Sequence, residues 1–215
     1  AEGVGVVEEL TAAGINVNIT LLFSVETYQA VALAYLAGLE RRLAAGQPLD
    51  RVASVASFFV SRIDTVVDPL LPAGSPLQGQ VAIANAKRAY QQFQRLVSGG
   101  RWARLAEAGA RVQRPLWAST GTKNPAYSDV LYVEALVGAD TVNTIPEATL
   151  DAFRDHGRVR HDAVLQGIEE AEHTLSLLPD HGISLKSITA QLLDDGLAAF
   201  DADLAKVTST IAELL

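Results

Sequence analysis

The chain has 215 residues, of which 49% are hydrophobic and 20% charged, a composition typical of a folded domain and not of a disordered segment. The 25 acidic residues outnumber the 17 lysines and arginines, and the resulting net charge of -8 argues against partners such as nucleic acid or an anionic membrane. The absence of cysteine excludes disulfides and thiolate chemistry, and no apolar run reaches the ~18–20 residues of a membrane span. We therefore expect a soluble, cytoplasmic protein.

The first predicted elements are a helix over residues 2–13 and a buried strand over residues 15–23. The strand is apolar except for Asn16, Asn18 and Thr20, which alternate along it and so point to one side. Polar side chains inside a protein are costly unless they bond to one another or to a ligand. The spacing of these three residues is equally consistent with a core network in which they hydrogen-bond to one another and with a binding site.

After a long helix, the second predicted strand covers residues 52–60. A hydroxyl, an aromatic ring and a guanidinium gather at its end, in Ser57, Phe59 and Arg62. An arginine in this place can bind a phosphate through two parallel hydrogen bonds. The alternative, which the spacing alone slightly favours, is an ion pair on the surface between Arg62 and Asp64.

A loop over residues 68–76, rich in proline, precedes two further helices and the third predicted strand, residues 114–119. The segment from Ser119 to Pro125 follows and holds three hydroxyls, a glycine and Lys123. Exposed backbone N–H groups, hydroxyls and a cation together can hold an anion. Because the glycine–lysine spacing of a P-loop is absent, the alternative is a polar turn that caps the next helix.

The fourth predicted strand, residues 140–145, ends at Pro146 and Glu147, which is typical of a helix N-terminus. No further strand is predicted after Glu147. The predicted helices cover residues 2–13, 25–45, 77–97, 102–108, 127–137, 147–156, 160–178 and 184–215. All four histidines lie in the last part of the chain without the i,i+4 pair of a metal site, so we expect no metal. The sequence also has no G-x-G-x-x-G motif for a dinucleotide, and we expect no cofactor.

Strands that alternate with helices predict an α/β fold with a parallel sheet, either doubly wound or a (β/α) barrel of the TIM type. The strand runs are largely apolar, so we expect both faces of the sheet to be buried. A complete barrel takes eight strands and roughly 250 residues. We count four strands and a helical tail, and we predict about half of a barrel over residues 1–157 with the tail, residues 158–215, packed on it.

The segments around the four strand ends resemble consecutive barrel segments of transaldolases, most closely the longer branch common in actinobacteria. They are residues 15–24 (INVNITLLFS), 54–62 (SVASFFVSR), 114–125 (RPLWASTGTKNP) and 141–150 (TVNTIPEATL), in the order of the family. The resemblance implies class I aldolase chemistry in the pentose phosphate pathway. A lysine would form a Schiff base with sedoheptulose or fructose phosphate, and a dihydroxyacetone unit would pass to an aldose phosphate.

The resemblance assigns catalytic roles to three residues and substrate binding to four: Asn18, Thr20 and Ser57, and Phe59, Arg62, Ser119 and Lys123. Asn18 and Thr20 match family residues that hold substrate hydroxyls and the catalytic water. Arg62 and Ser119 match the phosphate binders. Lys123 stands near the place where many members have arginine, which keeps the charge but loses the bidentate geometry.

The lysines of this chain do not match the family's Schiff-base lysine, which lies on the strand before the helix that opens this chain. The lysines present are Lys87, Lys123, Lys186 and Lys206. The chain also starts at Ala1 and contains no methionine. We therefore expect the C-terminal half of a transaldolase, inactive alone, that binds sugar phosphates and pairs with a missing N-terminal half or with another copy of itself. The alternatives are a non-catalytic sugar-phosphate-binding half-barrel and a fructose phosphate aldolase.

Overall fold

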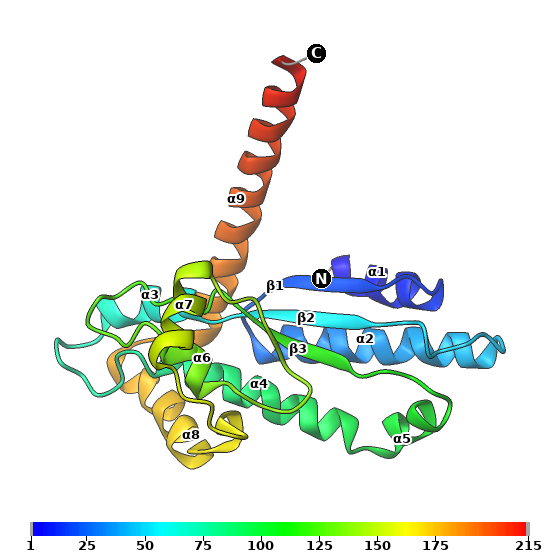
Figure 1. The fold of residues 1–215 in the computed structure, drawn as a ribbon, viewed down its shortest axis with the longest axis horizontal. Helices are drawn as coiled ribbons and strands as arrows, with labels where there is room; N and C mark the ends of the chain where they lie inside the picture. The colour runs from blue at the N-terminus through cyan, green and yellow to red at the C-terminus, as the bar shows by residue number, and fades with distance from the viewer. Residues whose placement is uncertain (1, 214–215) are drawn as a thin grey trace.

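A computed structural model describes residues 2–213, and its centre is a parallel sheet with the strand order β1–β2–β3–β4 (Figure 1). The strands are β1 (Val17–Leu22), β2 (Ser54–Phe59), β3 (Gln113–Ala118) and β4 (Val142–Asn143). All four lie within or next to the predicted strand segments, and among the described residues the sheet does not close on itself. The structure thereby confirms an α/β fold of the TIM-barrel type with four parallel strands.

The helices lie mostly where the apolar periodicity places them. They are α1 (Glu2–Ala12), α2 (Val25–Ala44), α3 (Ser61–Val67), α4 (Val81–Val97), α5 (Gly100–Glu107), α6 (Leu131–Ala135), α7 (Glu147–His156), α8 (Ile168–Leu177) and α9 (Leu185–Glu213). Short 3-10 turns cover Asp68–Leu70, Ala163–Leu165 and Leu178–His181. No helix among residues 2–213 is long and apolar enough to cross a membrane.

Two helix predictions are wrong. The sequence predicted no helix between residues 60 and 76, yet α3 follows β2 directly, because tertiary contacts and not periodicity hold this short element. A single helix was predicted over residues 160–178, but the chain turns before α8 begins at Ile168. Asp162 and Gly167 adopt left-handed backbone angles, with φ of 54° and 62°, and such residues interrupt an α-helix.

The core lies between the sheet and the helices of one face. Phe58 of β2 is 1% exposed and packs edge-on against Tyr28 of α2 and Trp117 of β3, with ring centroids 6.5 and 6.2 Å apart. The indole N–H of Trp117 donates to the carbonyl of Leu136 at 3.0 Å, so this buried polar group is satisfied. On the same side, α1 crosses α2 so closely at Gly38 that a side chain there would meet the Glu8 carbonyl oxygen at 2.7 Å.

The opposite face of the sheet is only partly covered, which corrects the expectation that both faces are buried. Asn18 and Thr20 of β1 are exposed on it. The first part of α9 packs at the end of β1, where a side chain on Gly196 would approach Leu21 to 2.9 Å. Beyond Gly196 the helix, red in Figure 1, stands away from the rest of the molecule.

Candidate functional site

Polar residues of β1 and β2 form a pair on the open face of the sheet. The Ser57 hydroxyl donates to Asn18 Oδ1 at 2.7 Å, and Ser57 is buried while Asn18 reaches solvent. Asn16 has a different role, because its Oδ1 accepts the backbone N–H of Ala53 at 2.8 Å. Thr20 lies further along β1 and is exposed. Of the three predicted polar residues, Asn16 precedes β1 and fixes the backbone, whereas Asn18 and Thr20 lie on β1 and face the open side.

The carboxyl ends of β2 and β3 meet through backbone and side-chain hydrogen bonds. The Ser61 N–H donates to the Ser119 carbonyl at 3.0 Å, and the two hydroxyl oxygens are 3.1 Å apart. Ser119 has a φ of 57°, a left-handed conformation that is unfavourable for a residue with a side chain. This strained turn places the Ser119 hydroxyl beside the first residue of α3.

Arg62 lies at the same junction with its side chain exposed. Its guanidinium carbon is 5.2 Å from the centroid of the Phe59 ring, a cation–π contact that fixes the side chain over the end of β2. The predicted alternative, an ion pair with Asp64, is wrong, because Asp64 points into the protein and is 1% exposed. Arg62 takes part in none of the ion pairs found within residues 2–213, so its guanidinium is available to an anion.

The segment after Ser119 does not cap a helix, so the second alternative is also wrong. The next helix, α6, begins only at Leu131. Instead, the Thr120 hydroxyl donates to Asn143 Oδ1 of β4 at 2.8 Å and ties the segment to the neighbouring strand. Lys123 is exposed and lines a cavity of about 210 Å³ together with Asp64 and Asp68. The structure therefore groups Lys123 with these carboxylates.

Two aspartates that the sequence analysis did not select are prominent near this cavity. Asp64 Oδ1 accepts the N–H of Ala82 at 2.7 Å, and its Oδ2 accepts the Tyr132 hydroxyl at 2.9 Å. Burial raises the pKa of Asp64 to about 7, although both hydrogen bonds favour the ionised form. Asp68 accepts the N–H of Gly79 and the Tyr127 hydroxyl at 3.0 and 2.6 Å. Their i,i+4 spacing was the available signal, but it is informative only if residues 61–68 are helical.

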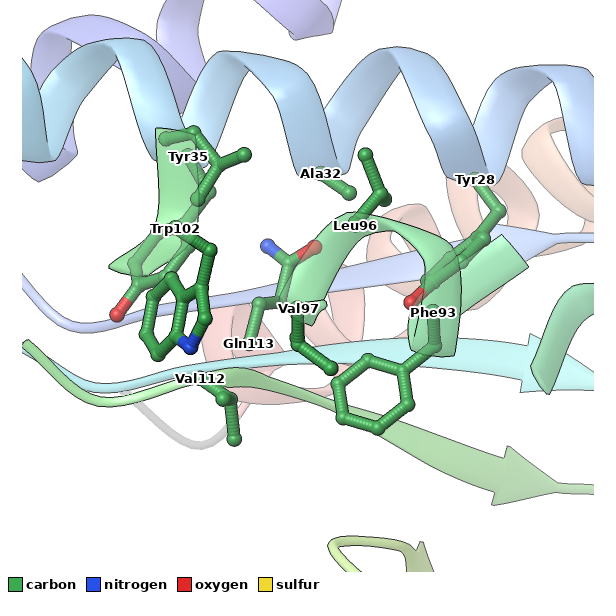
Figure 2. Close-up of a pocket in the computed structure, with 10 residues that line it drawn as sticks. Tyr28, Ala32, Tyr35, Phe93, Leu96, Val97, Trp102, Val112 and Gln113 are labelled. Atoms are coloured by element: carbon green, nitrogen blue, oxygen red, sulfur yellow. The ribbon is translucent and has the colours of Figure 1, made fainter. Parts of the chain in front are cut away.

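Two of the other cavities lie away from the aspartates. One of about 370 Å³ separates the end of β1 from α9 and is lined by Leu21, Ser24 and Lys186. The other, about 20 Å³, has room for one water molecule and lies between α2, α4, α5 and the start of β3 (Figure 2). There the Gln113 Nε2 donates to Ser54 Oγ at 2.9 Å. Because Gln113 is the first residue of β3, this small cavity lies at the opposite end of the sheet from Ser119.

The two remaining lysines lie away from the strand ends. Lys87 is half-buried on α4 and its Nζ donates to the Gln166 carbonyl at 2.5 Å. Burial lowers the pKa of Lys87. Lys206 is exposed on the outer part of α9. Neither side chain faces the Asn18–Ser57 pair.

Comparison with known proteins gives a consistent result. The family model described as Transaldolase/Fructose-6-phosphate aldolase matches residues 1–211. Transaldolase 1 of Streptomyces avermitilis is 46% identical over 218 residues, which cover 99% of this chain and 58% of that protein. The transaldolases of Renibacterium salmoninarum and Arthrobacter sp. are 46% and 48% identical, covering 100% and 94% of this chain and 59% and 56% of those proteins. The chain therefore spans somewhat more than half the length of these relatives.

Proposed function

Because the chain belongs to the transaldolase/fructose-6-phosphate aldolase family, we propose that it takes part in moving a dihydroxyacetone unit from a ketose phosphate to an aldose phosphate. The observation that carries this proposal is the junction of β2 and β3, where Arg62, Ser61 and Ser119 meet. We place the reaction in the pentose phosphate pathway and in the cytoplasm.

In the proposed complex, Arg62 and the hydroxyl of Ser119 bind the substrate phosphate, while the buried Ser61 holds the Ser119 hydroxyl in place at 3.1 Å. The exposed guanidinium matches the charge of a phosphate and the hydroxyl matches its acceptor oxygens. The sugar then lies over the open face, where Asn18, Thr20 and Ser57 contact its hydroxyls and the catalytic water. Phe59 lines the space between the residues that bind the phosphate and those that contact the sugar. Lys123, at the cavity with the aspartates, adds positive charge near the phosphate.

For the chemical step we propose a lysine Schiff base. A lysine amine condenses with the C2 carbonyl of the ketose and releases water, and the C3–C4 bond breaks as the C4 hydroxyl loses its proton. The aldose leaves, and the bound three-carbon enamine attacks the aldehyde carbon of the acceptor, whose oxygen takes up a proton. Water then hydrolyses the new Schiff base and releases the product ketose and the free lysine amine. Lys87 and Lys206 lie away from the open face. Lys123 lines the cavity with Asp64 and Asp68, and Lys186 lines the cavity between β1 and α9, so none of the four lysines lies on a strand of the sheet. We therefore assign the reacting lysine to a segment outside these 215 residues and expect no turnover by the chain alone.

Reductive trapping tests this assignment. The chain is incubated with fructose 6-phosphate and borohydride, which reduces a Schiff base to a permanent adduct, and its intact mass is measured. We expect the 22.8 kDa chain to stay unmodified and the adduct to form on the rest of a transaldolase polypeptide supplied with it. An adduct on the 22.8 kDa chain that disappears in Lys123→Arg or Lys186→Arg would refute it.

Phosphate binding is tested separately from turnover. We expect Arg62→Ala to weaken binding of fructose 6-phosphate, measured by titration calorimetry, roughly 10- to 100-fold, as for the loss of a charged hydrogen bond. The matched control is Arg154→Ala, an exposed arginine whose partner is Asp151 at 3.5 Å. Equal affinities of the two variants would refute the phosphate site.

A second candidate is a fructose phosphate aldolase, because the matching family model is described by both activities. Both reactions use the same phosphate and sugar contacts, so a product assay must separate them. Release of glyceraldehyde phosphate without an acceptor favours the aldolase. A half-barrel that binds the ketose phosphate but never turns it over, even with the rest of the barrel present, would instead be a non-catalytic binding module.

We propose that the partner of the chain is the remaining part of a transaldolase barrel. The edge of β1 is unpaired within residues 2–213, and α9 presents large apolar residues spaced by three and four positions: Leu197, Phe200, Leu204, Val207 and Ile211, each 52–66% exposed. This spacing fits a partner helix. A second copy is disfavoured, because each copy carries a net charge of -8 and Asp201 and Asp203 lie beside the stripe, so pairing would bring chains of like charge together. A homodimer by light scattering, with no binding to the rest of the barrel, would contradict this choice.

A further inference from the structure

Two aspartates one helical turn apart make the same pair of contacts. Asp64 joins the N–H of Ala82 to the Tyr132 hydroxyl, and Asp68 joins the N–H of Gly79 to the Tyr127 hydroxyl. In each pair one carboxylate oxygen accepts a backbone N–H and the other accepts a tyrosine hydroxyl. We call these four side chains, Asp64, Asp68, Tyr127 and Tyr132, the aspartate–tyrosine clamp.

The clamp joins three segments that are distant in the sequence. The aspartates lie on α3 and at its C-terminal end, directly after β2. The two backbone N–H groups lie at the start of α4, and the tyrosines follow the segment that begins at Ser119. Gly79 fits this arrangement, because its φ is 71° and a side chain there would meet the Tyr127 ring at 2.9 Å. The clamp therefore connects the chain after β2 to the chain after β3.

Neither of these connected segments is stable by itself. Helix α3 has seven residues, fewer than the ~12–15 that an isolated helix needs, and its N-cap residue Val60 offers no side-chain cap. The turn at Ser119 is strained by its left-handed backbone. Arg62 belongs to the first of these segments and the Ser119 hydroxyl to the second. The bonds between Ser61 and Ser119 join the two segments at one point. The two aspartate–tyrosine bonds of the clamp join them again further along, and the two bonds to backbone N–H groups tie the aspartates to the start of α4.

We propose that the aspartate–tyrosine clamp positions Arg62 and Ser119 relative to each other, so that the ends of β2 and β3 act as one phosphate-binding unit. The clamp residues are positioning residues, since their polar groups are used within the protein. Arg62 points outward from α3, whereas Asp64 is buried on its other side. This inference deepens the proposed function and rests on its phosphate site.

The test combines amide exchange with phosphate binding. The Ser61 N–H donates to the Ser119 carbonyl, so its hydrogen exchange reports opening of the junction. We expect Tyr127→Phe and Tyr132→Phe each to speed this exchange roughly 10- to 100-fold, the effect of losing one hydrogen bond to a charged group. The Phe58 amide in β2 serves as the internal reference for global unfolding. Tyr90→Phe is the matched control, because the Tyr90 hydroxyl donates to Ala139 at 2.9 Å, outside the clamp.

Phosphate affinity is measured on the same variants by titration of inorganic phosphate. Weaker binding in the two clamp variants, with Tyr90→Phe like the wild type, supports the proposal. Unchanged exchange at Ser61, or faster exchange with unchanged phosphate affinity, overturns it. Asp68→Ala removes two clamp contacts at once. It should therefore change the Ser61 exchange rate and the phosphate affinity measurably even if each single tyrosine variant changes them too little. A wild-type chain that binds no phosphate refutes the proposed function instead, and the clamp is then judged by the Ser61 exchange alone.

Discussion

Replacing Asp64 by asparagine should change how the stability of the protein depends on pH. Asp64 is 1% exposed, and burial is the main reason why its pKa rises from 3.8 to about 7. The folded protein therefore holds the Asp64 proton more tightly than the unfolded chain does. Stability falls as the pH rises from about 4 to about 7, and above pH 7 the loss is complete.

The pKa difference sets the size of the effect. A difference of about three pKa units corresponds to roughly 4 kcal/mol of unfolding free energy, and this is an upper bound because local relaxation reduces it. Asparagine is uncharged at every pH, and its side-chain oxygen can still accept the N–H of Ala82. The stability of Asp64→Asn relative to wild type should therefore increase between pH 4 and pH 8. The charged and titratable groups around this site are Asp68, Tyr132, Tyr127 and Lys123.

Urea unfolding followed by circular dichroism at pH 4.5, 6, 7 and 8 measures this difference directly. Asp151→Asn is the matched control, because it removes an exposed carboxylate whose ion pair with Arg154 contributes little. We expect the control to follow the wild type across the pH range. A stability difference between Asp64→Asn and wild type that is the same at every pH would refute the assignment of a buried, perturbed carboxyl.

Three further predictions concern other parts of the molecule. Arg62→Lys keeps the charge but not the planar fork, so we expect fructose 6-phosphate affinity between those of wild type and Arg62→Ala; an affinity equal to the alanine variant would contradict a charge contribution. Gly38→Ala should lower the unfolding free energy by about 1–3 kcal/mol because of the close approach of α1, whereas Gly5→Ala, with no atom within 4 Å, should raise it by about 0.5–1 kcal/mol. Leu204→Glu should leave the thermal midpoint of the chain unchanged, since the residue is 66% exposed, but should weaken binding to the rest of a transaldolase barrel in a pull-down titration.

The sequence by itself determined the strands and the polar residues at their ends. Short apolar runs of β-branched and aromatic residues between helical segments favour strands, and the alternation of β and α segments favours a parallel sheet. Arg62 and Ser119 could be selected from sequence because ligands of such folds bind where the strands end. The matching motifs around these positions correctly indicated the transaldolase family.

Only the tertiary structure decided how these residues are held. Helix α3 carries no periodic signal, because it is shorter than the length at which local preference suffices. The partners of Asp64 come from Ala82 and Tyr132, which are 18 and 68 residues away along the chain. Contacts at such separations leave no trace in local sequence pattern. They form only when the sheet has brought its strand ends together, and this is why the clamp becomes visible in the fold and not in the sequence.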